Sequence, residues 1–183
     1  PGRAYLQSRG FHTDVAKAFH LGWAPDGWSH LAEALRAEGF ADEDLLAAGL
    51  VRARDSGGVY DMFRGRLIIP ICDVKGRPVG FGARTVEPGG LPKYINSPQS
   101  ELFDKSHLLF GLHRAARAIR EAGEAVVVEG YTDVIRAHAA GFENVVASMG
   151  TALTEAQMAA LKRYAPVIVL ALDADAAGQA ATL

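Results

Sequence analysis

Cysteine is nearly absent from this sequence, since Cys72 is the only one among 183 residues. An internal disulfide is therefore excluded, and a reducing cytoplasm suits such a chain. Cys72 lies in the apolar run 67–72, so we expect a small core side chain. The sequence also lacks a run of about 18 apolar residues, which a membrane-spanning helix requires. Both absences favour a cytoplasmic protein.

Composition and length indicate a folded chain. Hydrophobic residues make up 49% of the sequence, which argues against disorder. The length suits one ordinary domain or two small ones. The sequence opens with Pro1-Gly2 rather than Met, and residues 180–183 resemble the middle of a helix. We therefore expect a fragment of a longer chain.

Charge is unevenly distributed along the chain. The net charge is −2, but residues 52–120 hold 12 Lys and Arg against 6 Asp and Glu. Residues 121–183 hold 3 Lys and Arg against 8 Asp and Glu. A basic middle beside an acidic end suits a site that holds polyanions together with metal ions, although charge also fluctuates along ordinary soluble proteins.

Residues 1–112 predict a basic N-terminal subdomain. Short amphipathic patterns over residues 1–50, separated by glycines such as Gly39 and Gly49, favour small helices. From residue 59 onward β-forming residues dominate, and Lys75-Gly76 separates two such runs as in a hairpin. We expect helices followed by an irregular, mainly antiparallel β region.

Residues 113–183 alternate between helical patterns and apolar runs. The runs at 125–128, 144–147 and 166–172 are separated by segments of helical length, and Thr154 is a plausible N-cap. Strands that are apolar throughout are typical of a parallel sheet covered on both faces. The predicted fold is α+β, with a Rossmann-like α/β subdomain over residues 113–183.

Four acidic residues lie at or near the carboxyl ends of the predicted strands. Glu129 follows the first strand, Asp173 follows the third, Asp133 is one helical turn beyond Glu129, and Asp175 is two residues beyond Asp173. Ligands of open α/β sheets bind at this edge. Clustered carboxylates suit Mg²⁺ or Mn²⁺. Helix capping and other acid-site α/β proteins, such as phosphotransfer receivers or phosphatases, remain alternatives.

Several motifs resemble those of a known family. Val-Val-Glu-Gly-Tyr-Thr-Asp-Val at 127–134 resembles the first Toprim motif of DnaG-type primases, segment 144–154 resembles the loop segment after it, and Leu-Asp-Ala-Asp-Ala-Ala-Gly at 172–178 resembles their Asp-x-Asp motif. Segments 63–71, 92–98 and 102–112 are also similar to primase segments. The acidic motif alone is weak, because topoisomerases and some nucleases share it. The ordered set over residues 60–180 is specific.

The resemblance implies a bacterial DnaG-type primase. Such an enzyme is a DNA-directed RNA polymerase that makes short RNA primers from NTPs on single-stranded DNA at replication forks, in the cytoplasm. It implies that Asp173 and Asp175 hold Mg²⁺ (or Mn²⁺), that Glu129 is a metal ligand or general base, and that Asp133 supports the metal site.

The same resemblance gives the basic middle a role. Five residues in family-like segments would bind the template backbone and the NTP triphosphate, namely Arg64, Arg66, Arg84, Lys93 and Lys105. Tyr94 and Asn96 would contact a base or a sugar, although packing roles are equally open. Gly80 and Gly82 either let the backbone approach nucleic acid closely or mark a bulge.

Some family features differ or are missing. Asp104 and Ser106 flank Lys105 where the family often has His and Gly. The family's last acidic Toprim motif does not occur, so we expect a Toprim subdomain that is truncated at its C-terminus. The zinc-binding domain and the domain that binds the replicative helicase are also missing. We therefore expect this chain alone to be weakly active or inactive.

Two rival functions follow from the same residues. One is another Toprim enzyme: a phage primase-helicase, a nuclease or a topoisomerase. A topoisomerase needs a tyrosine nucleophile, and no motif proposes one here. The other rival is a non-catalytic module that binds single-stranded nucleic acid and keeps the acidic residues for folding. Activity after loss of Asp173 distinguishes this module from a primase.

Overall fold

The computed structural model describes residues 1–149 and 152–173. The chain divides into two compact units, Pro1–Ile71 with Val79–Phe103 and Cys72–Pro78 with Asp104–Leu183. Residues 104–112, which the sequence analysis groups with the N-terminal subdomain, are part of the second unit. None of the described helices has the length and apolar character needed to span a bilayer.

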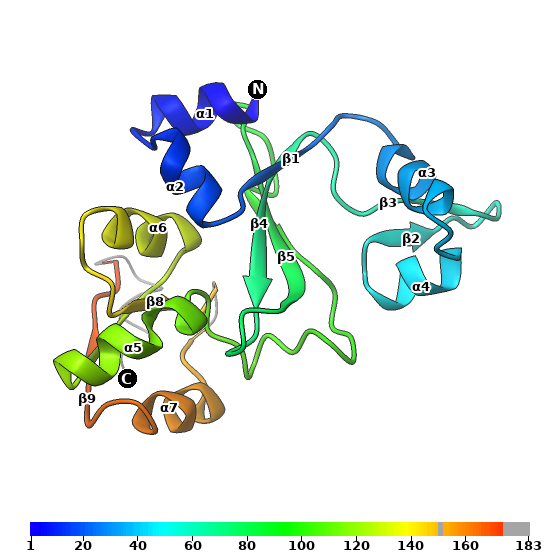
Figure 1. Cartoon of the computed structure of the whole chain (residues 1–183). Coiled ribbons are helices and arrows are strands. Elements are labelled where there is room, and N and C mark those ends of the chain that lie inside the picture. Colours follow the sequence, from blue (N-terminus) through cyan, green and yellow to red (C-terminus); the bar gives the residue numbers. More distant parts are fainter. Residues whose placement is uncertain (150–151, 174–183) are drawn as a thin grey trace. The chain divides into compact units, whose positions relative to one another are not determined.

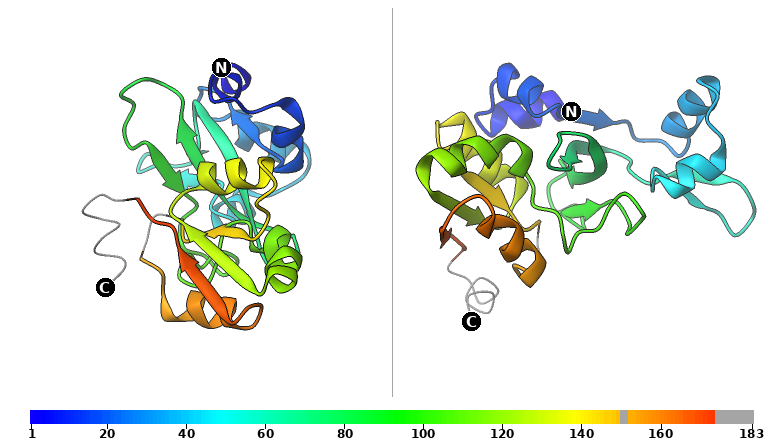
Figure 2. Two further views of the ribbon diagram at one scale, coloured as in Figure 1. Left: turned by 90° about the vertical axis from the view of Figure 1, so that its left-hand side faces the viewer. Right: turned by 60° about the horizontal axis from the view of Figure 1, so that its bottom comes forward.

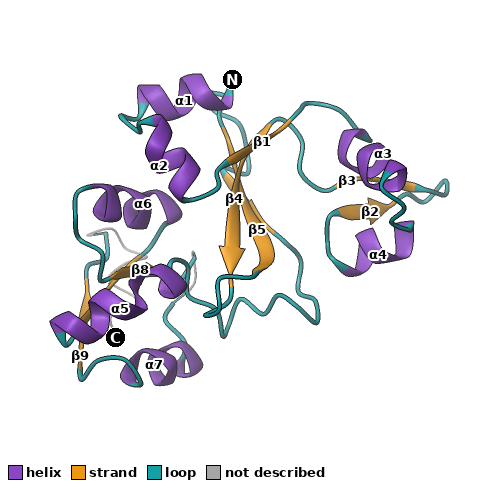
Figure 3. Cartoon of the chain, in the orientation of Figure 1, coloured by secondary structure: helices purple, strands orange, loops and turns teal. Residues whose placement is uncertain are grey.

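The first unit consists of short helices and antiparallel strands (Figures 1 and 3). Its elements are α1 (Gly2–Ser8), α2 (Thr13–Ala18), β1 (Gly22–Ala24), α3 (His30–Ala37), α4 (Asp42–Ala47), β2 (Val51–Ala53), β3 (Val59–Asp61), β4 (Arg66–Cys72), β5 (Pro78–Thr85) and β6 (Tyr94–Asn96). The main sheet has the order β1-β4-β5-β6, and β2 and β3 form a separate antiparallel pair. The sequence analysis did not predict β1 or β2, because three-residue strands are too short to show an alternating pattern.

Strand β4 shows why this sheet has a buried face. Its side chains alternate between buried and half-buried, and Leu67, Ile69 and Ile71 are at most 3% exposed. Each such side chain stabilises the fold by roughly 1.5–3 kcal/mol relative to exposure. Cys72 lies in the alternate position and is half-buried, so it is not the core residue that the sequence predicts. Partial burial raises the pKa of its thiol.

Gly80 in β5 has a packing role. A Cβ added at Gly80 would lie 2.5 Å from Cδ2 of Phe103, whose side chain is 2% exposed. The strand therefore approaches an aromatic ring of its own unit at a distance that only glycine permits. This contact is a third explanation for Gly80, distinct from the nucleic-acid approach and the bulge considered above.

The second unit is the predicted α/β subdomain. Its elements are α5 (Leu112–Ala122), β7 (Glu124–Val128), α6 (Tyr131–Ala139), β8 (Val145–Ala147), α7 (Glu155–Lys162) and β9 (Val167–Leu170). The three strands are parallel in the order β8-β7-β9, and Figure 2 shows β7 and β9 side by side. The predicted fold class is confirmed. The expected helix from residue 174 onward lies outside the described residues.

Helices pack on both faces of the parallel sheet over β7 and β8, whereas Val167, Val169 and Leu170 of β9 are exposed. Ile119 of α5 and Leu161 of α7 pack in one cluster with Val127 and Val146, so α5 and α7 share a face. Helix α6 lies across the sheet from α7 in Figure 1. A sheet covered on both faces requires apolar residues along the whole strand. Polar side chains are then expected at the ends of the strands.

Candidate active site and nucleic-acid interface

Glu129 and Asp173 meet at the carboxyl edge of the parallel sheet. Glu129 directly follows β7, and Asp173 lies three residues after β9, which is hydrogen-bonded to β7. The backbone N–H of Asp173 donates to Oε1 of Glu129 at 3.0 Å. The fold thus brings together two acidic residues that are 44 positions apart.

Asp133 lies in the first turn of α6, close to the same loop. A Cβ added at Gly130 would lie 2.8 Å from Oδ2 of Asp133, so this carboxylate lies over the residue that follows Glu129. The Asp133 side chain is exposed, as is that of Asp173, while Glu129 is half-buried. The strand-to-helix turn therefore brings two of the predicted acids near each other.

The donor set at this edge suits a hard divalent cation. Glu129, Asp133 and Asp173 offer only carboxylate oxygens, the donor type that Mg²⁺ and Mn²⁺ prefer. Within residues 1–149 and 152–173, no three His, Cys, Asp or Glu side chains are close enough to form a complete metal site. Asp175, the fourth predicted acid, lies outside the described residues.

Four of the predicted nucleic-acid residues form one group in the first unit. Arg66 Nη1 donates to the carbonyl of Pro92 at 2.9 Å, next to Lys93. Arg84 in β5 pairs with Tyr94 in β6, and its guanidinium carbon lies 5.4 Å from the Tyr94 ring centre. Lys93 Nζ lies 5.9 Å from the same ring. The antiparallel register of β5 and β6 thus brings Arg84 beside Tyr94 and Lys93, and the hydrogen bond to Pro92 adds Arg66 of β4.

Arg84 is a buried cation. It is 6% exposed, and its guanidinium carbon lies 4.5 Å from the Tyr5 ring centre in addition to its contact with Tyr94. Its Nε and Nη1 atoms have no hydrogen-bond partner among the described residues. Leaving two buried guanidinium nitrogens without an acceptor is costly, and the cost falls when an anionic ligand accepts their hydrogen bonds. Asn96, another of the predicted nucleic-acid residues, is paired with Gly82 in the antiparallel register of β5 and β6.

Arg64 belongs to an aromatic cluster that the sequence analysis did not identify. Its guanidinium lies 4.2 Å from the Trp28 ring centre and 5.2 Å from that of Tyr60. The two rings meet edge to face at 5.5 Å, and Trp28 is 59% exposed. Arg54 lies 5.7 Å from each ring. This cluster presents a large aromatic surface beside two cations.

Asp61 explains why Trp28 and Tyr60 meet. Its carboxylate accepts hydrogen bonds from the backbone N–H groups of Leu31 and Ala32, at 2.7 and 2.9 Å, and thereby caps α3. Its own N–H donates to the Trp28 carbonyl at 2.8 Å. A cap supplied by a distant strand leaves no local signal, since capping patterns in sequence are read over neighbouring residues.

Lys105, the remaining predicted residue, belongs to the second unit and is half-buried. Partial burial lowers the pKa of its ammonium group. The residues on either side of it interact with each other, because Ser106 Oγ donates to Asp104 at 2.6 Å and His107 Nδ1 lies 2.6 Å from the same carboxylate. The hydrogen bonds from Ser106 lower the pKa of Asp104 to about 2.

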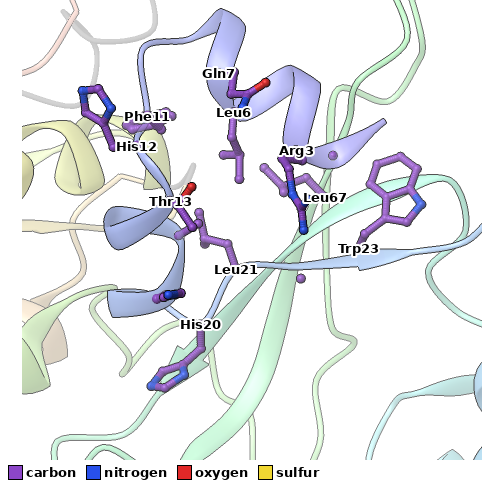
Figure 4. A pocket seen from close by; sticks show the side chains of 14 residues that line it. Arg3, Leu6, Gln7, Phe11, His12, Thr13, His20, Leu21, Trp23 and Leu67 are labelled. Atoms are coloured by element: carbon purple, nitrogen blue, oxygen red, sulfur yellow. The ribbon is translucent and has the colours of Figure 1, made fainter.

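A cavity of about 690 Å³ in the first unit contains none of the predicted site residues. It is lined by α1, α2 and β1, with Leu6, Leu21 and Leu67 around it and Arg3 at its side (Figure 4). The predicted chemistry lies elsewhere, on strand edges and exposed loops.

Comparison with known proteins yields one family for both units. Residues 1–116 match the family model of the DNA primase catalytic core, N-terminal domain, and residues 123–183 match the Toprim domain. The DNA primase of Deinococcus radiodurans is 46% identical over 185 residues, which cover 100% of this chain and 32% of that protein. The chain thus spans about a third of that curated relative.

Solved structures agree with this assignment. The RNA polymerase domain of Mycobacterium tuberculosis primase DnaG is 41% identical, with a TM-score of 0.89 over 98% of this chain and 60% of that one. A DnaG catalytic domain bound to single-stranded DNA is 37% identical, with a TM-score of 0.87 over 98% of this chain and 58% of that one. A Toprim primase core indicates the use of a divalent metal in general. Because the family models match residues 1–116 and 123–183 and the relatives are DNA primases, the chain belongs to the DnaG-type DNA primase family.

Proposed function

We propose that the full protein synthesises short RNA primers on single-stranded DNA by Mg²⁺-dependent nucleotidyl transfer. The observation that carries this proposal is the contact between Glu129 and Asp173 at the carboxyl edge of the sheet, in a chain of this family. The 3′-hydroxyl of a primer or initiating nucleotide attacks the α-phosphate of an incoming NTP. Pyrophosphate leaves as the new phosphodiester bond forms.

The acidic residues have separate roles in this proposal. Asp173 and Asp175 hold Mg²⁺, Glu129 is a further ligand or the general base, and Asp133 supports the site. When bound, Mg²⁺ neutralises charge on the phosphates and lowers the pKa of the attacking hydroxyl. The hydrogen bond from the Asp173 N–H engages Oε1 of Glu129, and in this proposal Oε2 is the atom that takes the metal or the proton.

The basic residues bind phosphate groups. Arg84 carries two buried guanidinium nitrogens, Nε and Nη1, without a partner in the described part of the chain, and phosphate oxygens are suitable acceptors for them. Arg66 and Lys93 lie in the same group, Arg64 lies beside the exposed Trp28, and Lys105 serves the second unit. Tyr94 and Asn96 contact a base or sugar. The bound single-stranded DNA of the related catalytic domain supports this role.

The cellular setting follows from the same proposal. Template DNA, NTPs and the growing primer are the substrates, and a replicative helicase is the protein partner, bound through a domain beyond this sequence. Zinc, where the full protein has it, belongs to another separate domain. The protein works in the bacterial cytoplasm at the replisome.

The experiment is a primer-synthesis assay on single-stranded DNA with the full protein and its Asp173→Ala variant. We expect the variant to lose primer synthesis and to keep its affinity for the DNA, because the acid acts on the metal and not on the template. Lys93→Ala serves as the matched comparison and should weaken DNA binding. Retained synthesis in Asp173→Ala would favour the non-catalytic binding module, and DNA cleavage without NTPs would favour another Toprim enzyme.

A further inference from the structure

Gln157 is a buried polar side chain that the proposed chemistry does not use. It lies in the first turn of α7 and is 0% exposed. Burying an amide without partners costs several kcal/mol, so such a side chain is kept only where it is fully bonded. Its partners therefore indicate what it does.

The amide of Gln157 fastens a loop that is about 50 residues away in sequence. Its Nε2 donates to the carbonyls of Lys105 and Leu108, at 3.1 and 2.8 Å. Its Oε1 accepts the backbone N–H of Thr154 at 3.0 Å. Both hydrogens and the oxygen are thus occupied, and the partner types fix the orientation of the amide.

Thr154 adds a hydrogen bond to the same loop, residues 105–108. We call the contacts of Thr154 and Gln157 with this loop the clamp. Thr154 Oγ1 donates to the Ser106 carbonyl at 2.6 Å and accepts the Gln157 backbone N–H at 3.1 Å. Three carbonyls therefore accept hydrogen bonds from the N-terminal end of α7. They are the carbonyls of Lys105, Ser106 and Leu108. A capping box usually serves its own helix, whereas here it also fixes another segment.

The clamp lies at the edge of the sheet where Glu129 and Asp173 meet. Helix α7 follows β8, so its first turn lies toward the carboxyl end of that strand. Just beyond the clamped loop, Phe110 pairs with Ala147, the last residue of β8, through backbone hydrogen bonds of 2.9 and 3.1 Å. The backbone of Lys105 is thus held near the acidic edge from two sides.

Lys105 is available to bind an anion. No carboxylate in the described part of the chain forms an ion pair with it, and its neighbour Asp104 is bonded to Ser106 and His107. A lysine side chain is a flexible point charge, so the position of its backbone decides which phosphate it reaches. A shift of about 1 Å in that backbone changes binding or turnover substantially.

We propose that Gln157 is a positioning residue, which holds the Lys105 loop so that the ammonium group meets a phosphate group at the acidic edge. This inference rests on the proposed function. The phosphate belongs to the NTP or to the template strand, and the arms of the experiment distinguish the two.

The experiment is a double-mutant cycle in the full protein with Gln157→Leu, Lys105→Ala and both together. Primer synthesis gives kcat and KM for NTP, and labelled single-stranded DNA gives the template Kd at fixed salt. Because Gln157 acts through Lys105, we expect Gln157→Leu to raise one of these constants about tenfold in the parent and less than about twofold when Lys105 is already Ala. A raised KM identifies the NTP, and a raised Kd identifies the template.

Two further variants separate positioning from stability. Asn144→Leu removes a comparable bond, from Nδ2 of Asn144 to the Glu124 carbonyl at 3.2 Å, within the same unit. It should lower the melting temperature and leave KM and Kd unchanged. Thr154→Val removes the bond to Ser106 and replaces Gln157→Leu in the cycle if that variant does not fold.

Each outcome decides the inference. The inference is overturned if Gln157→Leu changes KM or Kd by the same factor whether residue 105 is Lys or Ala. It is also overturned if Lys105→Ala has the KM and Kd of the parent. Both results leave the proposed function intact. Absence of primer synthesis in the parent overturns the proposed function instead. The DNA-binding arm of the cycle does not need catalysis, so the template Kd values then still show whether Gln157 acts through Lys105.

Discussion

Oε1 of Glu129 accepts a hydrogen bond of 3.0 Å from the backbone N–H of Asp173. The bond joins the ends of β7 and β9, which are neighbours in the parallel sheet. It orients the first acidic residue by the backbone of the second, so the pair does not depend on side-chain rotamers alone. A metal-binding edge benefits from such fixed donors.

Glu129→Gln separates the charge of this residue from its structural bond. The amide oxygen still accepts the Asp173 N–H, so the melting temperature should stay close to that of the parent. Loss of the negative charge removes a metal ligand or a base, and primer synthesis should fall at least about 100-fold. Parallel thermal melts and primer assays in Mg²⁺ and Mn²⁺ test this. Synthesis within about twofold of the parent would contradict the role given to Glu129.

Trp28→Ala should weaken binding of single-stranded DNA. The exposed ring lies beside Arg64 and Arg54, an arrangement on which a base can stack. Loss of one stacking contact costs about 1–3 kcal/mol of binding free energy. Fluorescence anisotropy with a labelled oligonucleotide at fixed salt measures the change. Trp28→Phe keeps a ring face and should recover part of the loss, and an unchanged Kd in Trp28→Ala would exclude stacking at this position.

Gly80→Ala should destabilise the first unit. The added methyl group would lie 2.5 Å from the ring of Phe103, which is 2% exposed. Overpacking of this kind costs about 1–3 kcal/mol in free energy of unfolding. Denaturant unfolding of Gly80→Ala, Phe103→Leu and the double variant measures the coupling. The double variant should lose less than the sum of the two single changes, and strict additivity would rule out the steric explanation.

His138 should make the stability of the second unit depend on pH. Burial lowers the pKa of His138 below its ordinary value of 6.5, against the opposing effect of its hydrogen bond to the Val145 carbonyl. Arg114 lowers this pKa further and Glu143 raises it. The unfolded chain therefore binds a proton more readily, and stability falls as pH decreases from about 6.5 toward the lower folded pKa.

Melting temperatures of the parent and of His138→Gln, taken between about pH 7.5 and pH 5, measure this effect. Gln keeps a donor for Val145 and does not titrate, so its melting temperature should fall less over this range. Parallel curves for the two proteins would show that His138 contributes nothing to the pH dependence.

The sequence by itself determined the parallel sheet and the acidic edge. Continuous apolar strands, the helices between them and the acids directly after the strands are local properties, and all three are readable in order along the chain. Glu129 and Asp173 were predicted to meet because parallel strands end at one edge. The structure shows them in contact.

Only the tertiary structure decided how distant residues combine. Trp28 meets Tyr60 because Asp61 at the end of β3 caps α3. Gly80 packs on Phe103, and Gln157 holds the Lys105 loop. In the sequence, Gln157 looks like the third residue of an ordinary capping box. Its second use depends on which carbonyls the folded chain places beside it, and no pattern around residue 157 identifies carbonyls about 50 residues away.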